Sequence, residues 1–236
     1  MTTWTLDIIE VGVIPSLPYT IYVPDAPSDR LIDVPCYTYL LTSPAHCVLV
    51  DSGPDTAAAS VAGFEVIGDA RTALTQALQS RNRTPNDVDI LLHTHLHYDH
   101  MQNDDLFPYA VIVVNEREIP WANSGQDRFY VGVETFLNAA KSRLRLIDRE
   151  LDLLDGIRIL PNGGHTPGHQ SVLVTTESGP TCLCADIIPL ADNRSILPPS
   201  LDPAATRAFM DRIRESSWTI VPGHDPDTRW SPHFFR

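Results

Sequence analysis

The sequence is poor in positive charge. It contains a single lysine, Lys141, and its 17 Lys and Arg residues face 30 Asp and Glu residues, which gives a formal net charge of −13. Proteins that bind nucleic acids or anionic membranes need dense Lys and Arg to neutralise phosphate groups. We therefore expect neither a nucleic acid nor a membrane surface as a partner, and a small molecule as the substrate.

Long apolar runs and paired cysteines are also missing. No stretch approaches the roughly 18 consecutive apolar residues of a membrane-spanning helix. The first twelve residues include Asp7 and Glu10 and do not form a basic, apolar leader. The cysteines are too few, and include no CxxC pair, for a disulfide framework: Cys36, Cys47, Cys182 and Cys184. We expect a cytoplasmic protein, with Cys182 and Cys184 buried on an apolar strand.

The remaining composition is that of a globular protein, with 43% hydrophobic residues in 236. We expect one domain over residues 1–236. Hydrophobic periodicity and turn residues predict an α/β layered sandwich built from two rough halves. Strands are predicted over Thr3–Val13, Tyr19–Val23, Cys36–Thr42, Cys47–Asp51, Val88–His93, Ala110–Val114, Ile157–Leu160, Ser171–Thr176, Thr181–Ala185 and Trp218–Val221, and helices over Asp69–Gln79, Val133–Leu146 and Asp202–Arg214.

The segment 93–100 has the densest set of potential metal ligands. Five of its eight residues can bind a metal: His93, His95, His97, Asp99 and His100. They follow a predicted buried strand, and His95 and His97 point to the same side if the backbone is extended. Asp99 and His100 come where the chain turns, so this one segment can supply ligands to two metal ions.

Three more ligand-type residues follow other predicted strands. His165 lies in a loop rich in Gly and Pro, Asp186 ends the strand that begins at Thr181, and His224 follows the last strand. Imidazole and carboxylate groups suit Zn, Fe, Mn and Co. No cysteine falls at a ligand position, so a thiolate-rich structural zinc site is not expected.

These motifs resemble those of the metallo-β-lactamase superfamily. The run His95-Leu-His97-Tyr-Asp99-His100 is similar to its HxHxDH signature, and residues 164–169, Gly-His-Thr-Pro-Gly-His, resemble its GHTPGH loop. Asp186 and His224 stand where that superfamily has its bridging aspartate and last histidine, and Asp51-Ser52-Gly53 resembles its D[ST]G turn. The resemblance implies a four-layer αββα sandwich.

The resemblance also implies a ligand set and a reaction. His95, His97 and His165 would bind one divalent ion, Asp99, His100 and His224 a second, and Asp186 would bridge them beside a hydroxide. That hydroxide would attack the carbonyl carbon of a small lactone or ester. Asp99 would also act as the catalytic residue that carries a proton to the leaving group. Zinc is the first expectation for both ions, with Fe, Mn or Co as alternatives.

Three neighbouring residues have expected supporting roles. We expect His93 to pack or hydrogen-bond beside the site, His169 to be a structural hydrogen-bonding residue, and Asp51 to orient an imidazole through its ring N–H. The segments Val13–Asp25 and Trp121–Arg149, rich in aromatic residues, are expected to form the pocket walls. They could instead form a homodimer contact.

Within the superfamily, the sequence is most similar to the N-acyl homoserine lactonases, with one departure. Those enzymes carry a tyrosine three residues after the bridging aspartate, and this chain has Pro189 there. Another hydroxyl would have to replace it, with Tyr37, Tyr39 and Tyr130 as candidates, or the substrate differs. The open alternatives are a glyoxalase II-like thioester hydrolase, a phosphodiester or aryl ester hydrolase, and a metal-binding regulatory pseudoenzyme.

Overall fold

The first half of the chain forms a mixed six-stranded sheet in the computed structural model, which describes residues 2–228. The strands are adjacent in chain order, antiparallel from β1 to β3 and parallel from β3 to β6. The parallel strands place the loops that follow β3 and β4 at one edge of the sheet. The strands are β1 (Thr5–Pro18), β2 (Leu31–Thr42), β3 (Cys47–Val50), β4 (Ile90–Leu92), β5 (Val111–Asn115) and β6 (Leu144–Ile147).

The second half forms a five-stranded sheet in the order β11-β10-β9-β8-β7. The pairing of β10 with β11 is parallel and the other pairings are antiparallel. Its strands are β7 (Leu151–Leu154), β8 (Ile157–Pro161), β9 (Gln170–Thr176), β10 (Gly179–Ala185) and β11 (Thr219–Pro222). Because β10 and β11 run the same way, the residues that follow them, Asp186 and His224, leave the sheet at the same edge.

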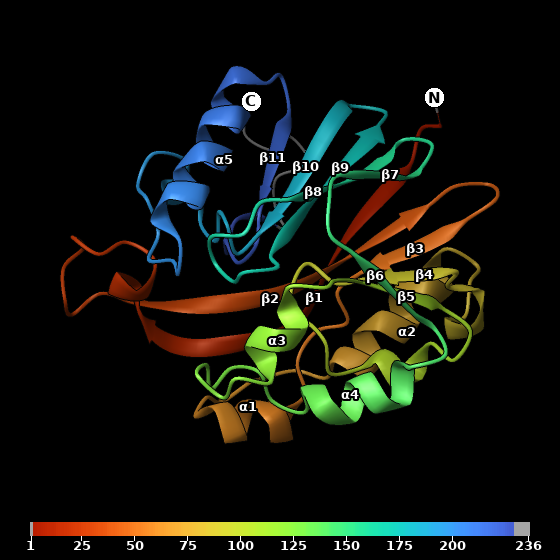
Figure 1. The fold of residues 1–236 in the computed structure, drawn as a ribbon, viewed down its shortest axis with the longest axis horizontal. Helices are drawn as coiled ribbons and strands as arrows, with labels where there is room; N and C mark the ends of the chain where they lie inside the picture. Colours follow the sequence, from red (N-terminus) through yellow and green to blue (C-terminus); the bar gives the residue numbers. More distant parts are fainter. Residues whose placement is uncertain (1, 229–236) are drawn as a thin grey trace.

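The helices lie outside the two sheets (Figure 1). Helices α1 (Thr56–Ala62), α2 (Ala70–Ser80), α3 (Glu118–Ala122) and α4 (Val133–Ala140) cover the first sheet, and α5 (Pro203–Glu215) covers the second. Short 3-10 helices span Tyr19–Ile21, Pro85–Asp87, Asp104–Leu106 and Ala191–Arg194. The predicted four-layer αββα sandwich is therefore confirmed.

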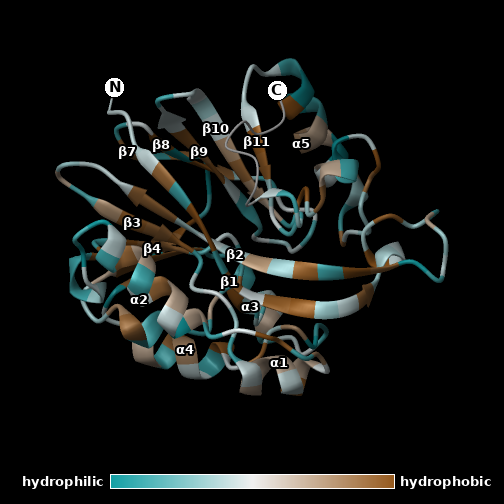
Figure 2. Cartoon of the chain, turned by 180° about the vertical axis from the view of Figure 1, so that it is seen from behind, coloured by the Kyte–Doolittle hydropathy of each residue, from teal (hydrophilic) through white to brown (hydrophobic). Residues whose placement is uncertain are grey.

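Apolar side chains separate the layers. One buried cluster lies between the sheets and includes Tyr39, Leu92 and Val172, whereas two others lie beneath the helices. In Figure 2 strand β3 is mostly brown, whereas β1 and β2 alternate between brown and paler or teal residues and the helices also carry teal, hydrophilic residues. Burying both faces of each sheet is the main stabilising term of such a sandwich. No helix in residues 2–228 is both long and apolar enough to cross a membrane.

Two predicted helix starts are confirmed by their caps. The carboxylate of Asp69 accepts a hydrogen bond from the backbone N–H of Thr72, and α2 begins at the next residue, Ala70. The carboxylate of Asp202 accepts from the N–H groups of Ala204 and Ala205, with proline at the first helical position. Such side chains satisfy N–H groups that have no partner within the helix.

The strand predicted over Tyr19–Val23 is wrong. Strand β1 already extends to Pro18, and the next residues turn into a 3-10 helix in which the N–H groups of Tyr22 and Val23 bond to the carbonyl of Tyr19 at 3.0 Å. The β-branched and aromatic composition favoured a strand. The local turn prevails because the chain reverses here to return along β1 as β2.

The helix predicted over Val133–Leu146 is too long. Helix α4 ends at Ala140, and Leu144–Ile147 form strand β6, paired in parallel with β5. Between them the guanidinium of Arg143 donates hydrogen bonds to the carbonyls of Phe107 and Ala110. Sheet pairing, a contact between segments distant in sequence, overrides the helical periodicity there.

The backbone conformation is unusual at the ends of strands β3 and β10. Asp51, just after β3, and Ala185, the last residue of β10, have φ values of 62° and 47°, a region that non-glycine residues rarely adopt. Gly223 packs against the backbone of Ala185, where a Cβ would lie 2.6 Å from its carbonyl group. Glycine at this position lets the chain segments that carry Asp186 and His224 approach closely.

Candidate metal centre

The seven ligand-type residues predicted from the sequence converge at one edge of the sandwich. Their donor atoms fall into three groups whose members lie within 4.8 Å of one another, and two of these groups share His95. One group joins His95, His97 and His165, and a second joins His95, His100 and Asp186. They come from the loops after β4, β8 and β10, far apart in sequence. The structure brings these residues together, and their binding of metal stays a prediction.

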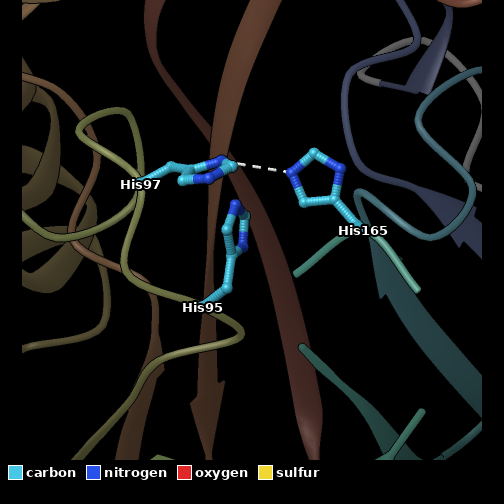
Figure 3. A group of neighbouring side chains, drawn as sticks. All are labelled: His95, His97 and His165. Carbon is cyan, nitrogen blue, oxygen red and sulfur yellow. Dashed lines mark hydrogen bonds between the residues drawn. The ribbon is translucent and has the colours of Figure 1, made fainter. Parts of the chain in front are cut away.

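The three histidines of the first group face one another (Figure 3). The Nδ1 atom of His97 lies 3.1 Å from the Nε2 atom of His165. The Nε2 atom of His97 lies 3.2 Å from a carboxylate oxygen of Asp127, a residue that the sequence analysis missed. A carboxylate behind an imidazole fixes the tautomer and orientation of the ring. The His165 side chain is 23% exposed, so the cluster opens to solvent at this residue.

Asp186 lies between His165 on one side and His100 and His224 on the other. Its Oδ2 atom is 3.4 Å from Nε2 of His165, whereas its Oδ1 atom is 3.3 Å from Nε2 of His100 and 3.1 Å from Nε2 of His224. Burial opposes its ionisation, but His224, His100 and His165 outweigh burial and hold the pKa of Asp186 well below its usual range. The carboxylate is therefore ionised and reaches both groups of imidazoles.

Several of these buried polar atoms have no hydrogen-bond partner within residues 2–228. They are Nε2 of His95, Nε2 of His100 and Oδ1 of Asp186. Leaving a buried polar atom unpaired costs free energy, so such atoms are rare in folded proteins. Burial, followed by the imidazoles of His100 and His97, keeps the pKa of His95 well below its usual range. A neutral imidazole is the form that binds a metal, and the donor set fits divalent cations.

The residues behind His100 hold it in place. A carboxylate oxygen of Asp51 lies 2.9 Å from Nδ1 of His100, and Asp51 also accepts hydrogen bonds from the N–H and hydroxyl of Thr94. Burial opposes ionisation, but His100 and His93 hold the pKa of Asp51 at about 2. The expectation that Asp51 orients an imidazole is confirmed.

His93 and His169 also have the supporting contacts expected of them. The Nε2 atom of His93 lies 2.8 Å from a carboxylate oxygen of Asp104, and its ring packs edge-on against Phe136. Nδ1 of His169 lies 2.7 Å from Oδ1 of Asn162. Burial lowers the pKa of His169 to about 3, so its ring is neutral. His46 is exposed as expected, and His233 lies outside the described residues.

Glu118 joins the two histidine loops, and sequence reasoning missed it. Its fully buried carboxylate accepts hydrogen bonds from the N–H of Leu96 and the hydroxyl of Tyr130 on one oxygen. The other oxygen accepts from the hydroxyl of Thr166 and the N–H of Gly168. Leu96 lies between His95 and His97, and Thr166 follows His165, so one side chain sets the spacing of both loops.

Cys36 lies beside the predicted ligands, although no cysteine was expected at a ligand position. Its Sγ atom groups with donor atoms of Asp99 and His224 within 4.8 Å. The side chain is buried on β2, 63 residues before Asp99 in sequence. Nothing in the spacing of the motifs indicated this contact, because it depends on how β2 packs against the loops that follow β4 and β11.

The candidate tyrosines predicted from the sequence are engaged elsewhere. The hydroxyls of Tyr37 and Tyr39 donate to the carbonyls of Asp225 and Pro222, and that of Tyr130 donates to Glu118. Two further tyrosines, Tyr22 and Tyr98, are influenced by the carboxylates of the centre. Burial, then Asp186 and Asp99, raises the pKa of Tyr22 well above its usual value.

Both predicted wall segments supply aromatic rings to the centre. The ring of Tyr22 lies 6.4 Å from that of His224 between centroids, and the rings of Phe129 and Tyr130 lie 5.4 and 4.9 Å from that of His97. A cavity of about 540 Å³ adjoins the loop that carries His165 and is lined in part by Arg117 and Trp121. The centre therefore combines polar donor atoms with apolar walls, as small-molecule sites commonly do.

The chain is thus an αββα sandwich with a buried cluster of histidines and aspartates at its edge, and this donor set suits divalent cations. Residues 31–224 match the metallo-beta-lactamase superfamily, and the chain belongs to that superfamily. It is an enzyme of the hydrolase class, as its relatives in that superfamily are.

The sequence relatives include lactonases. An N-acyl homoserine lactonase from Bacillus sp is 30% identical over 168 residues, which cover 66% of this chain and 65% of the relative, slightly under two thirds of its length. An N-acyl homoserine lactonase from Bacillus thuringiensis is 26% identical over 223 residues, with 87% of each chain covered.

Solved structures show the same fold. An N-acyl homoserine lactone hydrolase with N-hexanoyl-L-homoserine bound at its metal centre superposes with a TM-score of 0.82 at 21% identity, covering 100% of this chain and 98% of that chain. A dizinc quorum-quenching lactonase superposes with a TM-score of 0.74 at 18% identity, covering 96% and 89%. At these identities the superpositions establish the fold.

Proposed function

We propose that this chain is a dinuclear metal-dependent hydrolase that opens a small lactone or ester of the N-acyl homoserine lactone kind. One observation carries the proposal. The carboxylate of Asp186 extends from His165 to His100 and His224, and its Oδ1 atom has no hydrogen-bond partner in residues 2–228. A buried carboxylate between two sets of imidazoles is the arrangement that a pair of cations requires.

The proposed ligands divide between two ions. His95, His97 and His165 would hold the first ion, whereas Asp99, His100 and His224 would hold the second. Asp186 would contact both. Zinc is the expected metal for this set of nitrogen and oxygen donors, and Fe, Mn or Co also suit it. When bound, two such ions make water nucleophilic near neutral pH and polarise a carbonyl oxygen.

Asp99 is the residue that we expect to move the proton. Its Oδ2 atom lies 3.6 Å from Nε2 of His100 and 3.7 Å from Nε2 of His224. Oδ1 would then accept the proton of the attacking water and pass it to the leaving alkoxide. A carboxylate placed within reach of both the nucleophile and the leaving group can serve as base and then as acid.

Tyr22 is our candidate for the hydroxyl that the lactonases supply from the position of Pro189. Its ring lies beside that of His224, with 6.4 Å between centroids, and Asp186 and Asp99 add to burial in raising the pKa of its hydroxyl. The other candidate tyrosines donate to internal acceptors. A hydroxyl on the substrate carbonyl would stabilise the charge that develops on that oxygen during attack.

A hydrolysis screen with the zinc-loaded protein tests the proposal. The panel contains acyl homoserine lactones of several chain lengths, aryl lactones, aryl esters, thioesters and phosphodiesters. We expect turnover of lactones, with release of one proton per ring opened. Preference for a thioester would favour glyoxalase II-like chemistry instead. Failure to hydrolyse any of the five classes, in protein shown to hold two zinc ions, would contradict the proposal and favour a regulatory pseudoenzyme.

A further inference from the structure

Strand β2 brings a thiol beside the proposed second ion. The carbonyl of Pro35 lies 2.8 Å from Nδ1 of His224, so this ring nitrogen carries the proton and donates to the carbonyl. The Nε2 atom of His224 is therefore the ring nitrogen that faces Asp186 and Asp99, at 3.1 and 3.7 Å. The next residue of β2 is Cys36, so one strand orients His224 and supplies the thiol.

The distances suit coordination of a cation by all three groups. The Sγ atom of Cys36 and the donor atoms of Asp99 and His224 lie within 4.8 Å of one another, and all three residues are buried. Bonds of about 2.0–2.3 Å place neighbouring ligand atoms of a zinc ion about 3–3.5 Å apart. The Nε2 atom of His224 and the Oδ2 atom of Asp99, 3.7 Å apart, are already close to that spacing.

Two further buried side-chain atoms near the proposed second ion have no hydrogen-bond partner in the described residues. Nε2 of His100 and Oδ1 of Asp186 are buried and unpaired within residues 2–228, and they lie 3.3 Å from each other. Nε2 of His100 is also 3.6 Å from Oδ2 of Asp99. The thiol is therefore next to buried polar atoms without hydrogen-bond partners in the described residues, which distinguishes Cys36 from a cysteine that only fills the core.

Coordination to a divalent ion would make Cys36 a thiolate, since coordinated thiols are deprotonated. On binding, the thiol would release its proton to solvent, and its sulfur would donate an electron pair to the ion.

We propose that Cys36 is an additional, thiolate ligand of the second metal ion, together with Asp99 and His224. This inference rests on the proposed function, because it assumes that the second ion binds. A thiolate makes the second site softer than the all-imidazole group of His95, His97 and His165. The second site should therefore prefer zinc, cobalt or cadmium over manganese.

Cobalt absorption tests the inference without any assay of activity. The full chain, freed of metal, is titrated with Co²⁺ to two equivalents. We expect a near-ultraviolet absorption band from charge transfer between thiolate and cobalt, in addition to the visible bands of the ion. The band should be absent from Cys36→Ala and Cys36→Ser, and it should persist in Cys47→Ala, which removes another buried thiol at the start of β3.

Metal affinity gives a second measurement. In Cys36→Ser, the second equivalent of Cd²⁺ should bind at least about tenfold more weakly, whereas binding of Mn²⁺ should change little. Two cobalt ions bound without the ultraviolet band in the native chain would overturn the thiolate ligand and leave the dinuclear proposal intact. A band that survives in both Cys36 variants would also overturn it. A native chain that binds no cobalt would contradict both proposals.

Discussion

The hydroxyl of Thr166 donates a 2.7 Å hydrogen bond to Oε1 of Glu118, 48 residues earlier in the chain. This bond, with three more to the same carboxylate, fastens the loop of His165 to the loop of His95 and His97. Such contacts keep ligand-type side chains close even though the imidazoles repel one another when protonated. The stability of the centre thus depends on a residue that is not one of its proposed ligands.

Replacing Glu118 with glutamine should destabilise the fold. The amide has one acceptor oxygen for four donors, so at least two buried donors lose their partner at about 1–3 kcal/mol each. We expect a loss of about 2–6 kcal/mol in the free energy of unfolding, measured by urea denaturation. Glu116→Gln, an exposed change two residues earlier, is the matched control and should stay within about 0.5 kcal/mol. Equal stability of the two variants would contradict the role given to Glu118.

His97→Ala and Asp99→Ala should each abolish hydrolysis while the fold persists. Each change removes a proposed ligand, and the second also removes the proposed proton carrier. Steady-state rates with a lactone substrate and circular dichroism measure the two effects. His46→Ala alters an exposed histidine far from the cluster and should leave both unchanged. Full activity in either alanine variant of the cluster would exclude the proposed mechanism.

Metal removal should lower the melting temperature. Ions that bind the folded state alone stabilise it by about 2.7 kcal/mol at a free concentration one hundred times Kd. Dialysis against a chelator, with metal content checked before and after, should shift the thermal unfolding curve downwards, and added Zn²⁺ should restore it. An identical curve after verified removal would show that the buried cluster does not use metal for stability.

Tyr22→Phe and Tyr130→Phe should have different effects. The hydroxyl of Tyr22 is proposed to contact the substrate carbonyl, and its loss should lower kcat by about tenfold or more. The hydroxyl of Tyr130 donates to the buried Glu118, so its loss should mainly lower the free energy of unfolding, by about 1 kcal/mol. Comparing kcat and urea denaturation for the two variants separates the roles. A loss of kcat in Tyr130→Phe and a loss of stability alone in Tyr22→Phe would instead indicate that Tyr130 donates the hydrogen bond to the substrate carbonyl.

The sequence was enough to predict those elements whose structure depends on interactions between neighbouring residues. The caps Asp69 and Asp202 and the turn between β2 and β3 follow from side chains that bond to nearby backbone groups. The wrong predictions concern segments whose structure depends on contacts with residues distant in the sequence. Leu144–Leu146 continue a helical pattern, yet they become a strand because β5 offers an edge for pairing.

The same distinction applies to the candidate centre. Histidines and aspartates at motif spacing could be identified from the sequence, because a metal site needs those residue types after strand ends. Glu118, Asp127 and Cys36 could not. Each comes from a segment with no motif of its own and reaches the cluster only through the packing of helix α3, the loop at 127 and strand β2.

The most direct test of the account is a calorimetric titration of the metal-free chain with Zn²⁺. We predict two equivalents bound per chain, with the second lost in Asp99→Ala and both weakened in Asp186→Ala, whose carboxylate is proposed to contact both ions. Binding of one equivalent in the native chain would contradict a dinuclear centre, and binding of none would contradict a metal-dependent hydrolase altogether.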